Sequence, residues 1–153
     1  MIRLCNEVDR SWLRNTIPYP YQQEDAAWYI GQAKAREGKD AIFRAIIADG
    51  EIVGNISVEQ KGDLFAPDAE LGYLLRSDCA GHGIATEAVA QAVSIAFEKL
   101  PILRLTAQVC SLNAASCRVL EKNGFVLEGR LQNAVAKNGQ ICDLLLYGKV
   151  KSK

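Results

Sequence analysis

Residues 81–88 (GHGIATEA) constrain the fold of this 153-residue chain more than any other segment. They follow an alternating run typical of a strand and precede a long run with an apolar helical face. Two glycines so close together favour a tight turn with unpaired backbone N–H groups, and the following helix adds the positive end of its dipole. Such a turn can bind phosphate without lysine or metal, although a plain strand-to-helix turn also explains the two glycines.

Hydrophobic periodicity predicts the elements around this turn. Residues 70–75 and 103–109 alternate as strands on either side of a helix, which demands a parallel crossover between them. Asp49-Gly50 and Asn138-Gly139 are typical hairpin turns between antiparallel strands. In chain order we expect helices at about 6–14 and 23–37, strands at 41–48, 51–60 and 70–75, a helix from the turn to about residue 99, a strand at 103–109, a helix from the N-cap Asn113 to Lys122, and two or three strands from residue 125.

The expected fold is a single α/β domain over residues 1–153, with a mixed, mostly antiparallel sheet and helices on both faces. Lysine plus arginine and aspartate plus glutamate number 18 each, so the net charge does not indicate nucleic-acid binding. No apolar run approaches the roughly 20 residues that cross a bilayer. The first residues lack the apolar core of a signal peptide. We therefore expect a cytoplasmic protein with neither a membrane nor a nucleic acid as its partner.

The cysteines and the histidine indicate no metal site. No two cysteines form a CxxC pair, and His82 is the only histidine. An odd number of cysteines without such spacing is typical of free thiols in a reducing cytosol. The five thiols expected to be free are Cys5, Cys79, Cys110, Cys117 and Cys142.

A set of motifs, in this order and at these separations, resembles the GNAT N-acetyltransferase superfamily, and within it the branch that acetylates the N-termini (alanine) of ribosomal proteins. The resemblance implies a GNAT fold that uses acetyl-CoA as co-substrate and lets a primary amine attack the thioester directly. The implied acceptor is a protein or peptide N-terminus, while a polyamine or an antibiotic amine stays open. The motifs are ELGY at 70–73, GHGIATEA at 81–88, NAAS at 113–116, LEKNGF at 120–125 and EGRL at 128–131.

The resemblance also implies where acetyl-CoA binds. The sheet should separate between the strands at 70–75 and 103–109, so that the pantetheine arm bonds to free strand backbone. Asn113 would reach the cofactor, and its position as a helix N-cap explains it equally well. The implied binding residues are Tyr73, Leu74 and Leu75 for the pantetheine arm and Gly81, His82, Gly83, Ile84, Ala85 and Thr86 for the pyrophosphate.

Acetyl transfer needs a neutral amine and a proton for the leaving thiolate. Ser116 lies where the family places a hydroxyl near the cofactor sulfur, so it would donate that proton or else be a plain helix-start hydroxyl. Glu70 would be the base, directly or through water, or else a plain surface carboxylate on its strand, and Asp143 is the reserve candidate for the base. His82 should point outward from the turn. Four aromatic residues could line the acceptor pocket: Trp12, Tyr19, Tyr21 and Trp28. For the two tryptophans, packing in the core of the N-terminal helices explains them equally well.

Three features depart from the family pattern. Ala80 stands where glutamine or arginine usually opens the phosphate loop, and Gln108 stands where some relatives have a glutamate base. Both leave open a non-catalytic module that binds acyl-CoA. The family's first strand is absent unless residues 1–4 are its remnant, so the strand at 41–48 could have an uncovered edge. Such an edge invites pairing with another chain, and we therefore expect a homodimer.

Overall fold

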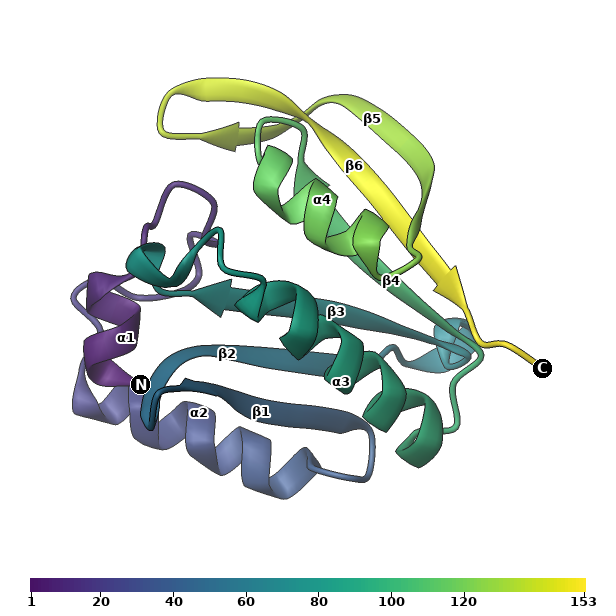
Figure 1. Cartoon of the computed structure of the whole chain (residues 1–153), viewed down its shortest axis with the longest axis horizontal. Coiled ribbons are helices and arrows are strands. Elements are labelled where there is room, and N and C mark those ends of the chain that lie inside the picture. The colour runs from purple at the N-terminus through teal and green to yellow at the C-terminus, as the bar shows by residue number, and fades with distance from the viewer.

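A six-stranded sheet runs through the middle of the protein, with the strand order β1-β2-β3-β4-β6-β5 (Figure 1). The computed structural model describes all residues from 1 to 153. The strands are β1 (Ala41–Ala48), β2 (Glu51–Gln60), β3 (Asp68–Leu75), β4 (Arg104–Cys110), β5 (Val126–Lys137) and β6 (Gln140–Val150). The helices are α1 (Ile2–Glu7), α2 (Gln23–Arg36), α3 (Ile84–Lys99) and α4 (Ala114–Lys122), with short 3₁₀ turns at Asp63–Phe65 and Ser77–Cys79. None of the helices is long and apolar enough to cross a membrane.

The sheet is mixed, as the sequence predicts. β1, β2 and β3 pair antiparallel, and so do β4, β6 and β5. β3 and β4 are parallel, because α3 carries the chain back along the sheet before β4 begins. The predicted α/β fold with a mostly antiparallel sheet is confirmed.

Helices lie on both faces of the sheet. Ile42 and Ile56 point into the core beneath α3, while the alternate residue Phe43 points to the other face. There the ring of Tyr29 from α2 packs edge-on against Phe43, with ring centroids 5.9 Å apart. The amide of Asn55 in β2 donates to the Tyr29 hydroxyl at 3.0 Å, which fixes α2 against this second face.

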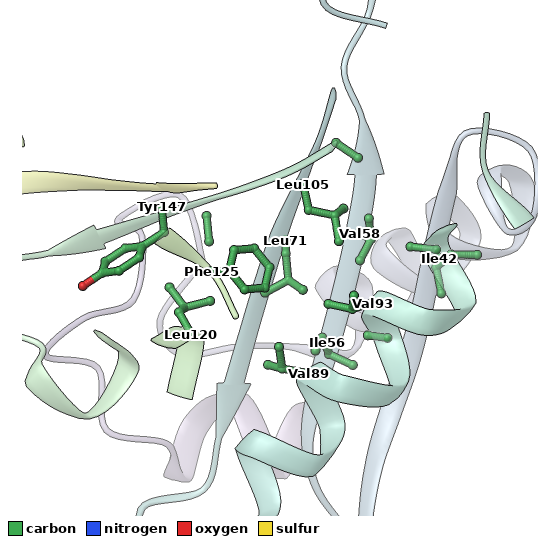
Figure 2. Packing of buried hydrophobic residues seen from close by; sticks show 14 of the residues in the cluster. Ile42, Ile56, Val58, Leu71, Val89, Val93, Leu105, Leu120, Phe125 and Tyr147 are labelled. Carbon is green, nitrogen blue, oxygen red and sulfur yellow. The ribbon is translucent and has the colours of Figure 1, made fainter. Parts of the chain in front are cut away.

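The main core lies between the sheet and the helices α3 and α4. The buried side chains of α3 recur every three or four residues, and Figure 2 shows two of them, Val89 and Val93, beside Ile56. Leu120 of α4 and Phe125 extend the same core toward Tyr147 of β6. Each such side chain contributes roughly 1.5–3 kcal/mol when it is fully buried. This packing fixes the position of both helix N-termini relative to the strands.

The N-terminal segment differs from the predicted helix at 6–14. The helix is α1, which ends at Glu7, and the next residues form a loop. The Asp9 carboxylate accepts the N–H of Ser11 at 2.9 Å, and the Arg10 guanidinium donates to the carbonyl of Ile17 at 2.6 Å. These bonds favour turns over a continuing helix. Trp12 is 40% exposed, so it does not pack in the core.

Smaller differences concern α2 and the strand ends. On α2, Ile30 is 43% exposed, and Tyr29 makes the contact with the sheet. Trp28 on the same helix is 68% exposed, so core packing is wrong for both tryptophans. β3 begins two residues before the predicted strand, at Asp68, because its first residues pair with both neighbouring strands.

Two of the five cysteines form a disulfide, so the prediction of five free thiols is wrong for this pair. The sulfur atoms of Cys110 and Cys142 are 2.10 Å apart, and the bond joins the end of β4 to β6. The cysteines are 32 residues apart in sequence, and only the pairing of β4 with β6 brings them together. Cys5, Cys79 and Cys117 are free. The cysteines therefore do not support the predicted reducing compartment.

Candidate active site

β3 and β4 separate partway along their length. Only residues 68–70 of β3 pair with residues 104–106 of β4. Beyond Glu70 and Thr106 the strands diverge, and Figure 1 shows α4 beside the opening. The sheet thus opens where the sequence predicts. On this side of β3, the backbone around Tyr73 has no strand partner and can bond to an extended ligand.

The glycine turn before α3 presents a run of unpaired donors. Gly81 and Gly83 both have φ of 78°, and Gly83 is the N-cap of α3 without any side-chain cap. No backbone N–H from Gly81 through Thr86 donates to another backbone group, whereas that of Glu87 bonds to the Gly83 carbonyl at 3.0 Å. A Cβ at either glycine would meet no atom within 4 Å, so the left-handed backbone is what requires glycine here. Free amides and a helix dipole together make this turn an anion site.

The residues flanking these glycines leave the turn open to solvent. The side chain of His82 is exposed, as expected, and makes no hydrogen bond within the protein. Ala80, where a polar residue was expected from the family pattern, is exposed as well. The backbone, rather than any side chain, therefore supplies the donors of this turn.

The start of α4 contacts β3 across the opening. The hydroxyl oxygens of Ser116 and Tyr73 are 2.7 Å apart, within hydrogen-bond distance. The side-chain oxygen of Asn113 accepts the backbone N–H of Ser116 at 3.2 Å, so Asn113 is the N-cap that the sequence predicts. Burial raises the pKa of Tyr73, although the bond to Ser116 acts in the opposite direction. The Tyr73 phenol is therefore neutral at physiological pH.

Glu70 lies at the point where β3 and β4 separate. It pairs with Thr106 across the last parallel step of the ladder. Because strand side chains alternate, Glu70 points to the opposite face of the sheet from Tyr73. Its carboxylate forms an ion pair with Arg14 from the N-terminal loop, and the Glu70 side chain is 28% exposed. Gln108 follows two residues after Thr106, so it is on the same face as Glu70, and it is exposed.

Asp143, the reserve base, is engaged in holding β5 in shape. Its carboxylate accepts the backbone N–H of Asn133 at 2.9 Å and the Arg130 side chain at 2.5 Å. These two bonds, that of Asn133 first, lower the pKa of Asp143. Asn133 has a left-handed φ of 53° in the irregular stretch of β5. Asp143 therefore stabilises a bulge, and its acceptor oxygens are already occupied.

The N-terminal loop and the β5–β6 hairpin meet on the Glu70 side of the sheet. The ammonium group of Lys137 donates to the carbonyl of Leu13 at 2.6 Å and to the side chain of Asn15 at 2.7 Å. Of the two tyrosines predicted for an acceptor pocket, Tyr19 is 68% exposed and Tyr21 is buried with Cys5 and Ala26.

The sequence predicted no role for the side chains of three residues in this region. For Tyr73 only the backbone was expected to bind the cofactor, and Arg14 and Lys137 received no role. The alternation of Leu71, Tyr73 and Leu75 indicated that Tyr73 faces the helices, but nothing in the sequence pairs it with Ser116. Arg14 and Lys137 lie in segments whose mutual contacts depend on the folded chain.

A groove of about 630 Å³ lies between β1 and the stretch of α3 from Ile84 to Ile95. It reaches the glycine turn at His82 and Gly83, but it does not include Tyr73, Ser116 or Glu70. Its walls are mostly apolar. The groove is therefore separate from the opening between β3 and β4, although both approach the same helix N-terminus.

Comparison with known proteins gives related sequences along most of the chain. It is 31% identical over 112 residues to the putative ribosomal N-acetyltransferase YdaF of Bacillus subtilis, an alignment covering 73% of this chain and 61% of YdaF. It is 29% identical over 147 residues to the ribosomal-protein-serine acetyltransferase of Escherichia coli, covering 93% of this chain and 81% of that protein. The chain thus spans about three fifths of the length of YdaF.

Solved structures give the same picture. The fold matches that of Mycobacterium smegmatis RimJ in complex with CoA-disulfide, with a TM-score of 0.79 and 25% sequence identity. The match covers 92% of this chain and 69% of the RimJ chain. Residues 2–126, from α1 through the glycine turn and α4, match the family described as the acetyltransferase (GNAT) domain. The protein described here is therefore a member of the GNAT acetyltransferase family.

Proposed function

We propose that this protein is an acetyl-CoA-dependent N-acetyltransferase whose acceptor is the N-terminal amine of a protein or peptide. The observation that carries the proposal is the run of unpaired amides from Gly81 through Thr86, at the mouth of an opening in the sheet. Phosphate groups bind well to such amides. The extended pantetheine arm matches the free backbone of Tyr73, Leu74 and Leu75 in the same opening. Asn113 and Ser116 lie on the other side of that opening.

The chemistry follows from the two faces of the split sheet. The amine approaches from the face that carries Glu70, which removes its proton directly or through water. The nitrogen forms a bond to the carbonyl carbon, the carbon–sulfur bond breaks, and the thiolate takes a proton from Ser116 on the other face. Glu70 and Ser116 then act at the two ends of the thioester. This arrangement explains why the base and the acid need not touch each other.

The acceptor class is supported by the relatives and by the surroundings of Glu70. YdaF is described as a putative ribosomal N-acetyltransferase, and the E. coli protein as a ribosomal-protein-serine acetyltransferase. In this chain, the loop holding Arg14 and the β5–β6 hairpin flank Glu70, and Lys137 joins them. Two segments beside this carboxylate can accommodate an extended peptide whose first amine points toward Glu70. We further propose that the protein binds acetyl-CoA and this amine as a homodimer, in which two copies of the chain pair along β1.

A non-catalytic acyl-CoA-binding module is the second candidate. It is favoured by Gln108, an exposed amide that cannot accept a proton, on the strand where some relatives have a base. Such a module would bind acetyl-CoA through the same turn but would release no thiol. A small-molecule amine as acceptor is the third possibility, and it differs only in what fills the space near Glu70.

The test is an assay for thiol release with a panel of amines, combined with calorimetry of acetyl-CoA binding. The panel contains a peptide with a free N-terminal alanine or serine, the same peptide with a blocked N-terminus and a free lysine, a polyamine and an antibiotic amine. We expect turnover only with the free N-terminus. Turnover of the polyamine or antibiotic instead would reassign the acceptor. Tight binding without turnover would favour the module, and absence of binding would refute the proposal.

A further inference from the structure

The hydroxyl groups of Tyr73 and Ser116 are 2.7 Å apart, and they come from β3 and α4 on opposite sides of the opening. We propose that Tyr73 is a positioning residue. Its hydroxyl orients the proton of Ser116 toward the sulfur of coenzyme A, and it supplies Ser116 with a new proton after that proton has been transferred. This inference rests on the proposed function. It gives a role to a side chain whose backbone alone was expected to bind the cofactor.

The number of hydrogen bonds that a serine hydroxyl can make favours Tyr73 as the donor and Ser116 as the acceptor. A serine hydroxyl has one proton to donate and two lone pairs that accept. If Tyr73 donates to Ser116, the single proton of Ser116 is free to point into the opening. If Ser116 donated to Tyr73, no proton would be left for a sulfur atom. The backbone N–H of Ser116 is already bonded to Asn113, so the first turn of α4 holds the hydroxyl in place.

The surroundings of Tyr73 favour it as the donor. Its side chain packs against the core beside Leu71 and Leu75, and this burial raises its pKa. The phenol therefore keeps its proton across the neutral range, when the amine acceptor reacts. A phenol is also a stronger acid than an alkyl alcohol, so it donates the stronger hydrogen bond. A chain of two hydroxyls polarises along its length, which strengthens the bond from Ser116 to a developing thiolate.

The proton transfers balance without any further reactant. As the carbon–sulfur bond breaks, the sulfur takes the electron pair of that bond and the proton of Ser116. The Ser116 oxygen takes the proton of the Tyr73 hydroxyl. The attacking nitrogen loses one proton when it becomes an amide, and water carries a proton back to Tyr73. The net change is one proton moved from nitrogen to sulfur.

A purely structural bond between β3 and α4 is the competing explanation. In that case, loss of the Tyr73 hydroxyl would loosen α4 and weaken acetyl-CoA binding, with little effect on kcat at saturation. A positioning role predicts the reverse. The two explanations are therefore separated by where the loss falls, on the dissociation constant for acetyl-CoA or on kcat.

The experiment compares Tyr73→Phe, Ser116→Ala and the double variant with the wild type. Tyr29→Phe is the matched control, because it also removes a bonded hydroxyl but lies on the other face of the sheet. For each protein, kcat is measured with saturating acetyl-CoA and the best acceptor of the panel. The dissociation constant for acetyl-CoA comes from calorimetry, and thermal melts confirm folding.

We expect Tyr73→Phe to lower kcat about tenfold to a hundredfold, and Ser116→Ala by roughly 10²–10⁴, while acetyl-CoA affinity changes less than about threefold. The double variant should be no slower than Ser116→Ala, because Tyr73 acts only through Ser116. Multiplicative losses in the double variant, or a loss of affinity alone, would overturn the inference and leave the proposed function standing. A wild type without turnover would overturn both.

Discussion

At the scale of single residues, Glu70 carries the assignment of the base, and its carboxylate already has a partner. The guanidinium of Arg14 is 70% exposed, so this ion pair lies largely in water and contributes little to stability. An incoming ammonium group can therefore compete with Arg14 for the carboxylate.

Glu70→Gln should lower kcat/KM most at neutral pH and less at alkaline pH, where neutral amine is plentiful without a base. General bases contribute roughly 10²–10⁴ to the rate, so the loss at pH 7 should fall near the lower end of that scale. The measurement is a pH–rate profile with one amine acceptor. Glu59→Gln is the control, because it removes an ion-paired glutamate from β2. An unchanged profile for Glu70→Gln would assign proton removal to solvent.

Asp143 should make stability depend on pH. Its pKa is lowered in the folded protein by the N–H of Asn133 and by Arg130. A carboxyl with a lowered folded pKa stabilises the protein above its unfolded pKa of about 3.9, and this stabilisation is lost as the pH falls through the folded value. Asp143→Asn should therefore lower Tm at pH 7 but much less below pH 3. Thermal melts across pH 2–7 test this, with the exposed Asp49→Asn as control; parallel curves for wild type and Asp143→Asn would contradict it.

At the scale of elements, the sequence correctly predicted the features that short-range patterns determine. The cap by Asn113 and the glycine turn both depend on residues within a few positions of each other. The prediction of a helix at 6–14 was wrong, because the side chains of Asp9 and Arg10 bond to the backbone of the loop. Local periodicity cannot report such bonds.

The same distinction explains how much of the candidate site was predictable. The anion turn and the position of Ser116 follow from local motifs. The bond between Tyr73 and Ser116 spans 43 residues, and that between Arg14 and Glu70 spans 56. These pairs depend on where β3 and β4 diverge, which no single segment encodes. The disulfide between Cys110 and Cys142 was missed because it depends on the pairing of β4 with β6, two strands that are far apart in the sequence.

The turn at the start of α3 gives the prediction at this scale. Gly83→Ala should weaken acetyl-CoA binding at least about tenfold, or ~1.4 kcal/mol, because alanine disturbs the left-handed turn that presents the free amides. Forcing alanine into this backbone region costs about 1–2 kcal/mol of stability. Gly38→Ala is the matched control, since Gly38 has φ of 74° at the end of α2. Both variants should lose stability, but only Gly83→Ala should lose affinity by calorimetry; equal affinity in both would refute the assignment of this turn.

At the scale of the whole molecule, the sheet has two edges, and β1 forms one of them. The first half of this edge is covered, because the Glu37 carboxylate accepts the N–H of Phe43 at 2.7 Å and Arg44 donates to the Phe43 carbonyl. In the second half, Ala45 and Ile47 are exposed, and no side chain bonds to their backbone. No strand lies outside β1, since residues near the N-terminus form α1. The free half also borders the apolar groove beside α3.

An apolar edge strand with free backbone groups favours pairing with another strand. We therefore predict that two copies of the chain associate through β1, and that light scattering at high micromolar concentration gives twice the 16.7 kDa of one chain. Ile47→Lys should shift the protein to the monomer, because a charge at the edge opposes pairing. Ile52→Lys is the matched control: Ile52 is the residue opposite Ile47 on β2, it is 51% exposed, and it does not lie on the edge. A wild type with the mass of one chain would refute the dimer, and equal dissociation of both variants would place the interface away from β1.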